Sequence, residues 1–207
     1  KSALSHLVYL ASRLTPDDVQ LQVTDFTWVA SFHELFAPLL AGATVRMAPL
    51  DITEIDALTQ ALQNSTIGQF TPTVLMHLMS HGLSIPSSLR TIILTGESFP
   101  SDLAKRIRHG NADIEIWNHY GQTEGVDTTT VYRLPGAIEF DKVFEHLDKV
   151  PIGLPAPHRS VKIVDSHGQV APVGELVLEG VGVCPCLTEG QEEVNFEDVS
   201  VLHTGDV

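Results

Sequence analysis

The sequence predicts an α/β protein with a mostly parallel sheet flanked by helices, followed by a small β-rich, barrel-like subdomain. Over the first 149 residues, short apolar runs typical of strands alternate with runs of helical periodicity. A hydrophobic content of 43% is enough for a buried core. From Val150 the chain becomes rich in Pro and Gly and carries short alternating runs. We therefore expect an α/β part at 1–149 and a β-rich part at 150–207.

The expected elements follow in order along the chain. Apolar spacing predicts helices at 2–13, 32–40, 55–62, 73–80 and 100–109. Strands are expected at 19–23, 44–47, 67–70, 91–94, 114–117, 160–164 and 175–178. Asp51 and Thr53 are candidate caps for the third helix, and Asp165-Ser166-His167-Gly168 predicts a hairpin turn. Ligands of such sheets bind beyond the carboxyl ends of the strands, where 95–98 and 118–124 are expected as loops.

Charge and composition narrow the classes of partner. With 26 acidic and 12 basic residues, a net charge of -14 repels phosphate backbones, so we expect no nucleic-acid partner. Every apolar run is too short to span a bilayer, so no membrane segment is expected. Cys184 and Cys186 lie one residue apart, too close for an ordinary disulfide, which favours a reducing, cytoplasmic setting.

The segment Tyr120-Gly121-Gln122-Thr123-Glu124 combines groups that suit a nucleotide. A tyrosine ring can stack on a purine, a threonine hydroxyl can donate to a phosphate, and a glutamate can hold Mg²⁺. An ordinary turn with a half-buried tyrosine is the alternative that local composition leaves open.

With its two preceding residues, this segment resembles the Asn-x-Tyr-Gly-Pro-Thr-Glu motif of the adenylation domains of nonribosomal peptide synthetases, with Gln122 in place of Pro. Matches to other motifs of this family occur in the same order, and together they cover nearly the whole chain. They are Ala37-Pro38-Leu39-Leu40-Ala41-Gly42-Ala43, Leu94-Thr95-Gly96-Glu97, Val150-Pro151-Ile152-Gly153-Leu154-Pro155, Pro172-Val173-Gly174-Glu175-Leu176 and His203-Thr204-Gly205-Asp206.

The resemblance implies an enzyme that activates a carboxylic acid with ATP as acyl-AMP and transfers the acyl group to the phosphopantetheine thiol of a carrier-protein domain. It also implies partner modules of a multidomain synthetase. By the same resemblance, Thr123 and Glu124 are catalytic, and Glu124 holds Mg²⁺. The residues that it assigns to ATP or AMP are Gly96, Glu97, Asn118, Tyr120, Gly121 and Asp206.

The chain also departs from the family pattern. It resembles an internal fragment, because the phosphate loop that precedes this region in the family and the Lys-bearing subdomain that follows it are absent. We expect the intact parent to be a ligase and the fragment alone to be inactive. The stretch from Gly182 to Asp198, with Val183-Cys184-Pro185-Cys186, differs from the basic turn usual in the family.

Alignment on Pro38 places Val29 where members that activate amino acids carry an Asp. A buried ammonium group facing Val29 would lose its counter-charge, so we expect an acid without an α-amine: an α-keto, α-hydroxy or aryl acid. Asp25 could be the missing Asp if about four residues were inserted after it. The disturbance of the following helix argues against that register.

The same alignment implies a rather polar acyl pocket, and recognition of a polar group is expected. Its residues are Val29, Ala30, His33, Gln69, Ile93, Thr95, His119, Asp127 and Thr128. Alternatively, His33 and Gln69 are satisfied by the neighbouring backbone. The pair His77 and His81 lacks an evident third metal ligand, which favours a surface role.

Two other functions share these features. A degenerate adenylation-like domain kept as a scaffold or docking surface is one, and an acyl-CoA ligase is the other. Retention of Thr123, Glu124 and Asp206 favours the adenylating enzyme.

Overall fold

A computed structural model describes residues 2–48, 53–125, 127–157, 159–179, 183 and 201–207. Cys184, Cys186 and all of the stretch from Gly182 to Asp198 except Val183 lie outside the described residues. So does Asp51, one of the two predicted caps; the third helix begins after Glu54, whose side chain makes no capping hydrogen bond.

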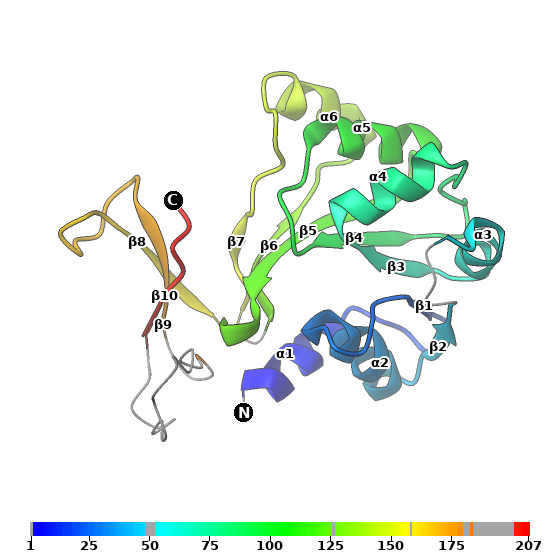
Figure 1. Ribbon diagram of the computed structural model, residues 1–207, viewed down its shortest axis with the longest axis horizontal. Helices are drawn as coiled ribbons and strands as arrows, with labels where there is room; N and C mark the ends of the chain where they lie inside the picture. Colours follow the sequence, from blue (N-terminus) through cyan, green and yellow to red (C-terminus); the bar gives the residue numbers. More distant parts are fainter. Residues whose placement is uncertain (1, 49–52, 126, 158, 180–182, 184–200) are drawn as a thin grey trace.

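A seven-stranded sheet in the order β2-β1-β3-β4-β5-β6-β7 forms the centre of the larger part (Figure 1). Its strands are β1 (Val19–Gln22), β2 (Thr44–Met47), β3 (Ile67–Phe70), β4 (Thr91–Thr95), β5 (Glu115–Gln122), β6 (Asp127–Arg133) and β7 (Leu154–Pro155). The first five pair in parallel, and β6 and β7 add in antiparallel orientation. The predicted, mostly parallel sheet is confirmed.

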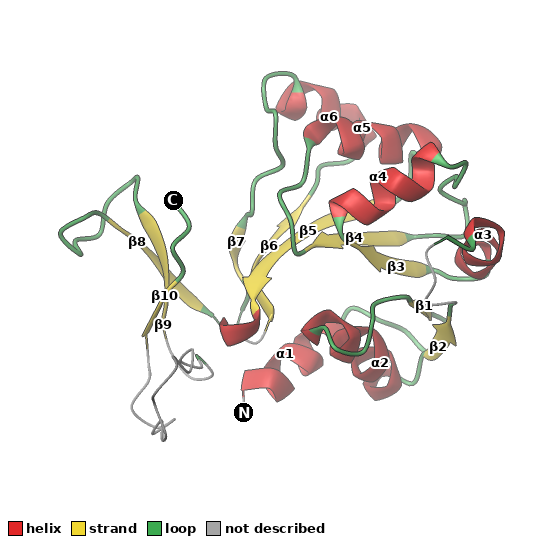
Figure 2. Cartoon of the chain, in the orientation of Figure 1, coloured by secondary structure: helices red, strands yellow, loops and turns green. Residues whose placement is uncertain are grey.

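Helices cover both faces of this sheet, as Figure 2 shows. The helices α1 (Ser2–Ala11) and α2 (Val29–Ala41) lie on one side. The main apolar core on the other side includes α3 (Ile55–Gln63), α4 (Pro72–Ser80), α5 (Ser101–Gly110) and α6 (Ala137–Phe144). Within the described part of the chain, no helix is long and apolar enough to cross a lipid bilayer.

A second, three-stranded antiparallel sheet is formed by β8 (Ser160–Val164), β9 (Glu175–Glu179) and β10 (Val201–His203). It confirms that the C-terminal part is β-rich. The predicted turn at 165–168 is present: the Gly168 amide donates to the Asp165 carbonyl at 2.9 Å, and Gly168 has a φ of 74°. The chain thus places a small sheet beside the larger α/β part (Figure 1).

The main difference from the sequence prediction is the length of β5. We expected a strand ending at Trp117 and a loop after it, but β5 continues to Gln122. The reason is β6, which the sequence did not predict and which pairs with β5 from Trp117 to Gln122. A bulge interrupts this pairing, since Tyr120 faces Thr130 while Gly121 faces Thr128. Asn118–Gln122 therefore lies within a strand, and the short helix η1 (Thr123–Gly125) follows it.

The pleat of the central strands gives the sheet two different faces. Ile92, Leu94 and Ile116 point to the apolar core. Residues in register with one another on the opposite face are largely polar. They form the rows Ile67–Thr91–Glu115, Gln69–Ile93–Trp117 and Thr95–His119. Parallel sheets are usually apolar on both faces, so the polar face beneath α1 and α2 marks a region built for something other than packing.

An ion pair between the buried Asp18 and the partly exposed Arg90 joins the segments that precede β1 and β4. The guanidinium of Arg90 donates two hydrogen bonds of 2.6 Å to the carboxylate of Asp18. Asp18 also accepts from Thr66 Oγ1 at 2.8 Å and from the Thr15 amide at 2.8 Å. Burial alone raises the pKa of Asp18, but the hydrogen bonds from Arg90, Thr15 and Thr66 hold it well below its ordinary value. The pair therefore ties β1 to the start of β4.

Glu34 joins α2 to the end of β1. One of its carboxylate oxygens accepts from the Val23 and Thr24 amides at 3.1 and 3.0 Å, and the other accepts from Thr24 Oγ1 at 2.7 Å. Burial raises the pKa of Glu34 from 4.5 to about 7, although the hydrogen bonds from Thr24 and Val23 and the neighbouring His33 oppose the rise. The segment after β1 is thus held by a carboxyl group that titrates near neutral pH.

We predict that Asp18→Asn destabilises the chain by about 2–3 kcal/mol in urea unfolding, because it leaves the partly buried Arg90 without its counter-charge. Asp102→Asn, which removes the exposed 3.7 Å pair with Lys105, serves as the matched control and should cost about 0.5 kcal/mol or less. Equal effects of the two substitutions would contradict the assigned role of the Asp18 pair.

We also predict that Glu34 makes stability depend on pH. Its folded-state pKa is raised, so its contribution is complete below pH 4.5 and is lost as the pH rises to about 7. Over this range the stability difference between the native chain and Glu34→Gln should fall by up to about 3 kcal/mol. Urea midpoints at several pH values measure it, with the exposed Glu139→Gln as control; a difference that does not change with pH rules the effect out.

Candidate active site

Two clefts and one small cavity adjoin the central strands. The larger cleft, here called the Tyr120 cleft, has a volume of about 700 Å³, and the second, the Trp28 cleft, has about 590 Å³. The two clefts share four lining residues from the ends of β4 and β5: Gly96, Glu97, Gly121 and Gln122. They are thus two arms of one depression at the carboxyl edge of the parallel strands, where ligands of such sheets bind.

The Tyr120 cleft collects most of the residues expected to contact the nucleotide. Gly96, Glu97, Asn118, Tyr120, Gly121 and Asp206 all line it. The Tyr120 hydroxyl donates to Oδ2 of Asp206 and accepts from Nε2 of Gln122, at 3.3 Å in the latter case. Burial and the hydrogen bond to Asp206 raise the pKa of Tyr120 above its ordinary value. Gln122, which replaces the usual Pro, thus supplies a donor that Pro lacks.

The turn that carries Asp206 is fixed to β9 by several hydrogen bonds. The Asp206 carbonyl accepts from the Leu176 amide at 2.9 Å, and Thr204 Oγ1 donates to the Leu176 carbonyl at 2.7 Å. The carboxylate of Glu175 accepts from His203 Nδ1 and from the Gly205 amide, both at 2.9 Å. The hydrogen bond from His203, and to a smaller extent that from the Gly205 amide, lowers the pKa of Glu175. Asp206 is therefore held at the cleft by the small sheet.

Gly96 and Glu97 shape the boundary between the clefts. Gly96 has a φ of 82°, which side chains rarely adopt, so a glycine is needed there for conformation rather than for space. Oε2 of Glu97 accepts from the Thr73 amide at 2.9 Å, at the start of α4. The side-chain Nδ2 of Asn118 donates to the Pro151 carbonyl at 2.9 Å. Glu97 and Asn118 line the cleft while bonding to the protein itself, which the sequence did not indicate.

The Trp28 cleft brings together residues predicted for the acid and for catalysis. Val29, Ala30, Gln69, Thr95, Thr123 and Glu124 line it. Several other lining residues were missed by the sequence analysis, namely Val23, Thr24, Trp28, Phe70, Thr71 and Val74. Asp25, the alternative to Val29, lies in the same cleft; its Oδ1 accepts from the amide and hydroxyl of Thr27 at 2.9 and 2.6 Å. The hydrogen bonds from Thr27 lower the pKa of Asp25.

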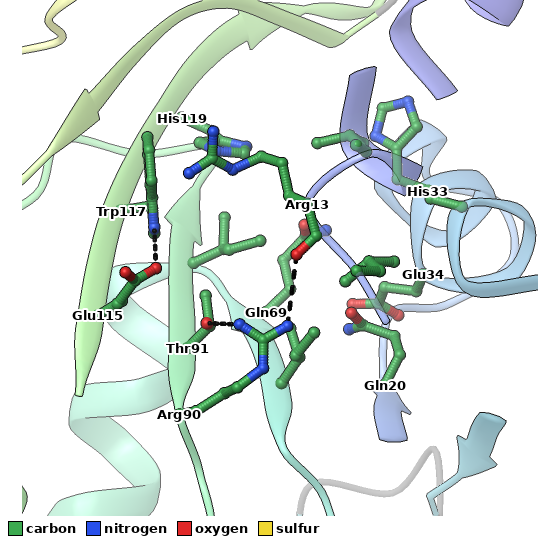
Figure 3. Close-up of a pocket in the computed structure, with 15 residues that line it drawn as sticks. Arg13, Gln20, His33, Glu34, Gln69, Arg90, Thr91, Glu115, Trp117 and His119 are labelled. Atoms are coloured by element: carbon green, nitrogen blue, oxygen red, sulfur yellow. Dashed lines mark hydrogen bonds between the residues drawn. The ribbon is translucent and has the colours of Figure 1, made fainter. Parts of the chain in front are cut away.

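A smaller cavity of about 70 Å³ lies between α1, α2 and the polar sheet face (Figure 3). Four predicted acyl-pocket residues line this inner cavity: His33, Gln69, Ile93 and His119. Gln69 also lines the Trp28 cleft, and His119 also lines the Tyr120 cleft. Nε2 of Gln69 lies 3.5 Å from the Ala30 carbonyl, a long hydrogen bond. Gln69 therefore adjoins both the inner cavity and the Trp28 cleft, and His119 adjoins both the inner cavity and the Tyr120 cleft.

Two predicted pocket residues lie on β6. Asp127 pairs with Gln122 through the backbone, and its side chain is outside the described set. Thr128 is 1% exposed and faces Gly121 at the bulge. Thr128 is not among the residues that line the inner cavity.

A hard cation such as Mg²⁺ needs oxygen ligands, and it is commonly bound by one or two carboxylates together with substrate phosphates. Glu124, half-buried in η1 and lining the Trp28 cleft, offers such a carboxylate. No group of three potential His, Cys, Asp or Glu ligands occurs in the described part of the molecule. His77 and His81 stack at 4.2 Å between ring centroids on α4.

Comparisons with known proteins agree with this geometry. The family model described as "AMP-binding enzyme" matches residues 2–187. Gramicidin S synthase 2 of Brevibacillus brevis is 33% identical over 178 residues, which are 81% of this chain and 4% of that protein. The chain thus spans a small part of the relatives it matches.

Among solved structures, the adenylation domain AlmE of Vibrio cholerae, in complex with glycyl-adenosine-5'-phosphate, superposes with a TM-score of 0.72 at 23% identity. It covers 88% of this chain, and this chain covers 36% of it. The nonribosomal peptide synthetase FmoA3 in its AMPPNP-bound form gives 0.78 at 22% identity, covering 88% of this chain and 20% of the other. At these identities the likeness shows a shared fold. By the match of the family model, the chain belongs to the AMP-binding enzymes and covers part of an adenylation domain of the nonribosomal peptide synthetase type.

Proposed function

We propose that the chain supplies the acid site and the nucleotide site of an ATP-dependent, acid-activating ligase. The observation that carries the proposal is the pair of clefts that meet at Gly96, Glu97, Gly121 and Gln122. An acyl-AMP has two unlike ends joined by one phosphate, and two arms of different lining suit such a molecule. The nucleoside belongs in the Tyr120 cleft and the acyl group in the Trp28 cleft.

In this reaction a carboxylate oxygen of the acid forms a bond to the α-phosphorus of ATP. The bond from the α-phosphorus to its bridging oxygen breaks, and pyrophosphate leaves with the electron pair. Thr123 and Glu124, which line the Trp28 cleft and directly follow the shared residue Gln122, are proposed to stand beside the phosphate. Thr123 donates a hydrogen bond to a phosphate oxygen, and Glu124 would hold Mg²⁺, which neutralises charge on the phosphates when bound. The remaining contribution is positioning of the two reactants.

Val29, the first residue of α2, favours a substrate acid that has no α-amine. Val29 lines the acyl arm and cannot offset a buried ammonium charge. We therefore propose an α-keto, α-hydroxy or aryl acid as substrate. Asp25 is the carboxylate nearest to this position in sequence and already accepts two hydrogen bonds from Thr27. We further propose that the acyl group passes to the phosphopantetheine thiol of a carrier domain in the parent synthetase.

We predict that Asp206→Ala in the intact parent raises the KM for ATP by about 10- to 100-fold, because it removes a carboxylate that accepts hydrogen bonds from the ribose. The KM for the acid should not change, because the Trp28 cleft is untouched. Pyrophosphate exchange at varied ATP concentration measures both constants. The exposed Asp113→Ala serves as the control for a lost surface charge, and an unchanged KM for ATP in Asp206→Ala would exclude the ribose contact.

A second prediction concerns the acid. Val29→Asp should raise kcat/KM for an α-amino acid relative to its α-keto analogue by about 10-fold or more, since it restores a counter-charge. The native parent should prefer the keto, hydroxy or aryl acid. Asp25→Asn distinguishes the two registers: if Asp25 binds an ammonium group, the native enzyme prefers the amino acid and Asp25→Asn abolishes that preference.

A further inference from the structure

The inner cavity contains a charged residue that the acyl pocket expected from the sequence does not include. Arg13 follows α1, and its guanidinium reaches over the polar sheet face toward Trp117 and His119 (Figure 3). It lies 4.1 Å from the centroid of the Trp117 ring and 5.9 Å from that of Tyr9. A guanidinium in contact with an aromatic face keeps N–H groups at its edge that can still donate hydrogen bonds.

The other charged residues of this cavity are matched by groups of the protein. Arg90 is paired with Asp18 through two hydrogen bonds, and it also donates to Thr91 Oγ1 at 3.1 Å and to the Arg13 carbonyl at 3.4 Å. The carboxylate of Glu34 accepts hydrogen bonds from the Val23 and Thr24 amides and from the Thr24 hydroxyl. Glu115 is paired with Arg133. Arg90 and Glu115 therefore have ion-pair partners within the fold, and the Glu34 carboxyl has hydrogen-bond donors.

Arg13 differs from these three residues. Its side chain is exposed at the edge of the cavity and contacts aromatic rings, and no carboxylate of the described residues forms an ion pair with it. A guanidinium group carries five N–H donors in a fork that fits a carboxylate through two parallel hydrogen bonds. The cavity thus has at its edge one exposed cation that no carboxylate of the described residues pairs with, and an anionic group of a ligand can supply the counter-charge.

The size and position of the cavity limit what that counter-charge can be. Its volume of about 70 Å³ holds a group of only a few non-hydrogen atoms. Gln69 separates it from the Trp28 cleft, in which the reacting end of the acid is proposed to lie. The group that reaches Arg13 is then the distal end of the same acid.

We propose that Arg13 is a specificity-determining residue, and that the substrate is an acid with a second carboxylate at its distal end. This inference rests on the proposed function, since it places the distal group by reference to the acyl arm. Gln69, His33 and His119 surround the same space with side chains that can donate hydrogen bonds to that carboxylate. A carboxylate that enters this cavity loses part of its hydration and gains such partners, and Arg13 supplies the opposite charge at the exposed edge.

The test is pyrophosphate exchange by the intact parent synthetase with matched acids. One series is α-ketoglutarate, its distal methyl ester and α-ketovalerate, and the other is glutamate, its distal methyl ester and norvaline. In the series that the enzyme activates, the diacid should exceed its ester and the monoacid in kcat/KM by about 10-fold or more, as expected for a charge-assisted hydrogen bond.

Arg13→Met keeps an apolar side chain against Trp117 and removes the charge. It should raise the KM for the diacid by about 10-fold or more, with kcat and the ester's kinetics unchanged, and Arg13→Lys should retain part of the preference. Arg106→Met, which removes an exposed cation on α5, is the matched control and should change neither.

Three results would overturn the inference alone: a native enzyme that prefers the ester or monoacid, an aryl acid as the preferred substrate in a wider panel, or Arg13→Met lowering exchange of all acids equally. Absence of exchange with every acid of that panel, which also includes aliphatic and hydroxy acids, would instead overturn the proposed function, and the inference with it.

Discussion

The pleat of β3, β4 and β5 is the constraint on which the rest of the site depends. Because successive side chains point to opposite faces, one register sends Ile92, Leu94 and Ile116 into the apolar core and sends Gln69, Thr91 and His119 to the other side. A shift of one residue in any strand would exchange the two sets and bury polar groups in the core. The hydrophobic core thus fixes the direction of the polar residues without contacting a ligand.

Around this sheet, polar side chains of the protein set the walls of the clefts. Glu34 fixes the segment after β1, Glu97 bonds to the start of α4, and Asn118 bonds to Pro151. The turn that bears Asp206 is attached to β9 through Glu175 and Leu176. Each of these bonds joins two elements that are distant in sequence. Preorganisation of this kind lowers the cost of positioning two reactants.

The sequence predicted the alternation of strands and helices well, because strands such as Thr91–Thr95 contain a short apolar run with clear boundaries. It did not predict β6, although Asp127–Arg133 is rich in Thr, Val and Tyr, which favour strands, because the expected elements rest on apolar periodicity and this segment has little of it. For the same reason the extension of β5 through Tyr120 was missed. The β-propensity of this segment is a local signal, but the strand with which it pairs is set by tertiary contacts.

The candidate site was predicted in part. Family resemblance selected Val29, Gln69, Tyr120 and Asp206, which the fold brings to adjoining clefts. Arg13 could not be found in this way, because it is distant in sequence from every motif and its position becomes apparent only when α1 lies over the sheet. The partners of Glu97 and Asn118 likewise depend on tertiary contacts.

The central claim is that one acyl-adenylate occupies both arms. A crystal structure of the intact parent with a non-hydrolysable acyl-adenylate analogue, in which a sulfamate replaces the phosphate, tests it most directly. The account predicts adenosine in the cleft lined by Tyr120 and Asp206, the sulfamate beside Thr123, and the acyl group directed past Val29 toward Gln69. Adenosine bound elsewhere, or an acyl group directed away from the polar sheet face, would contradict it.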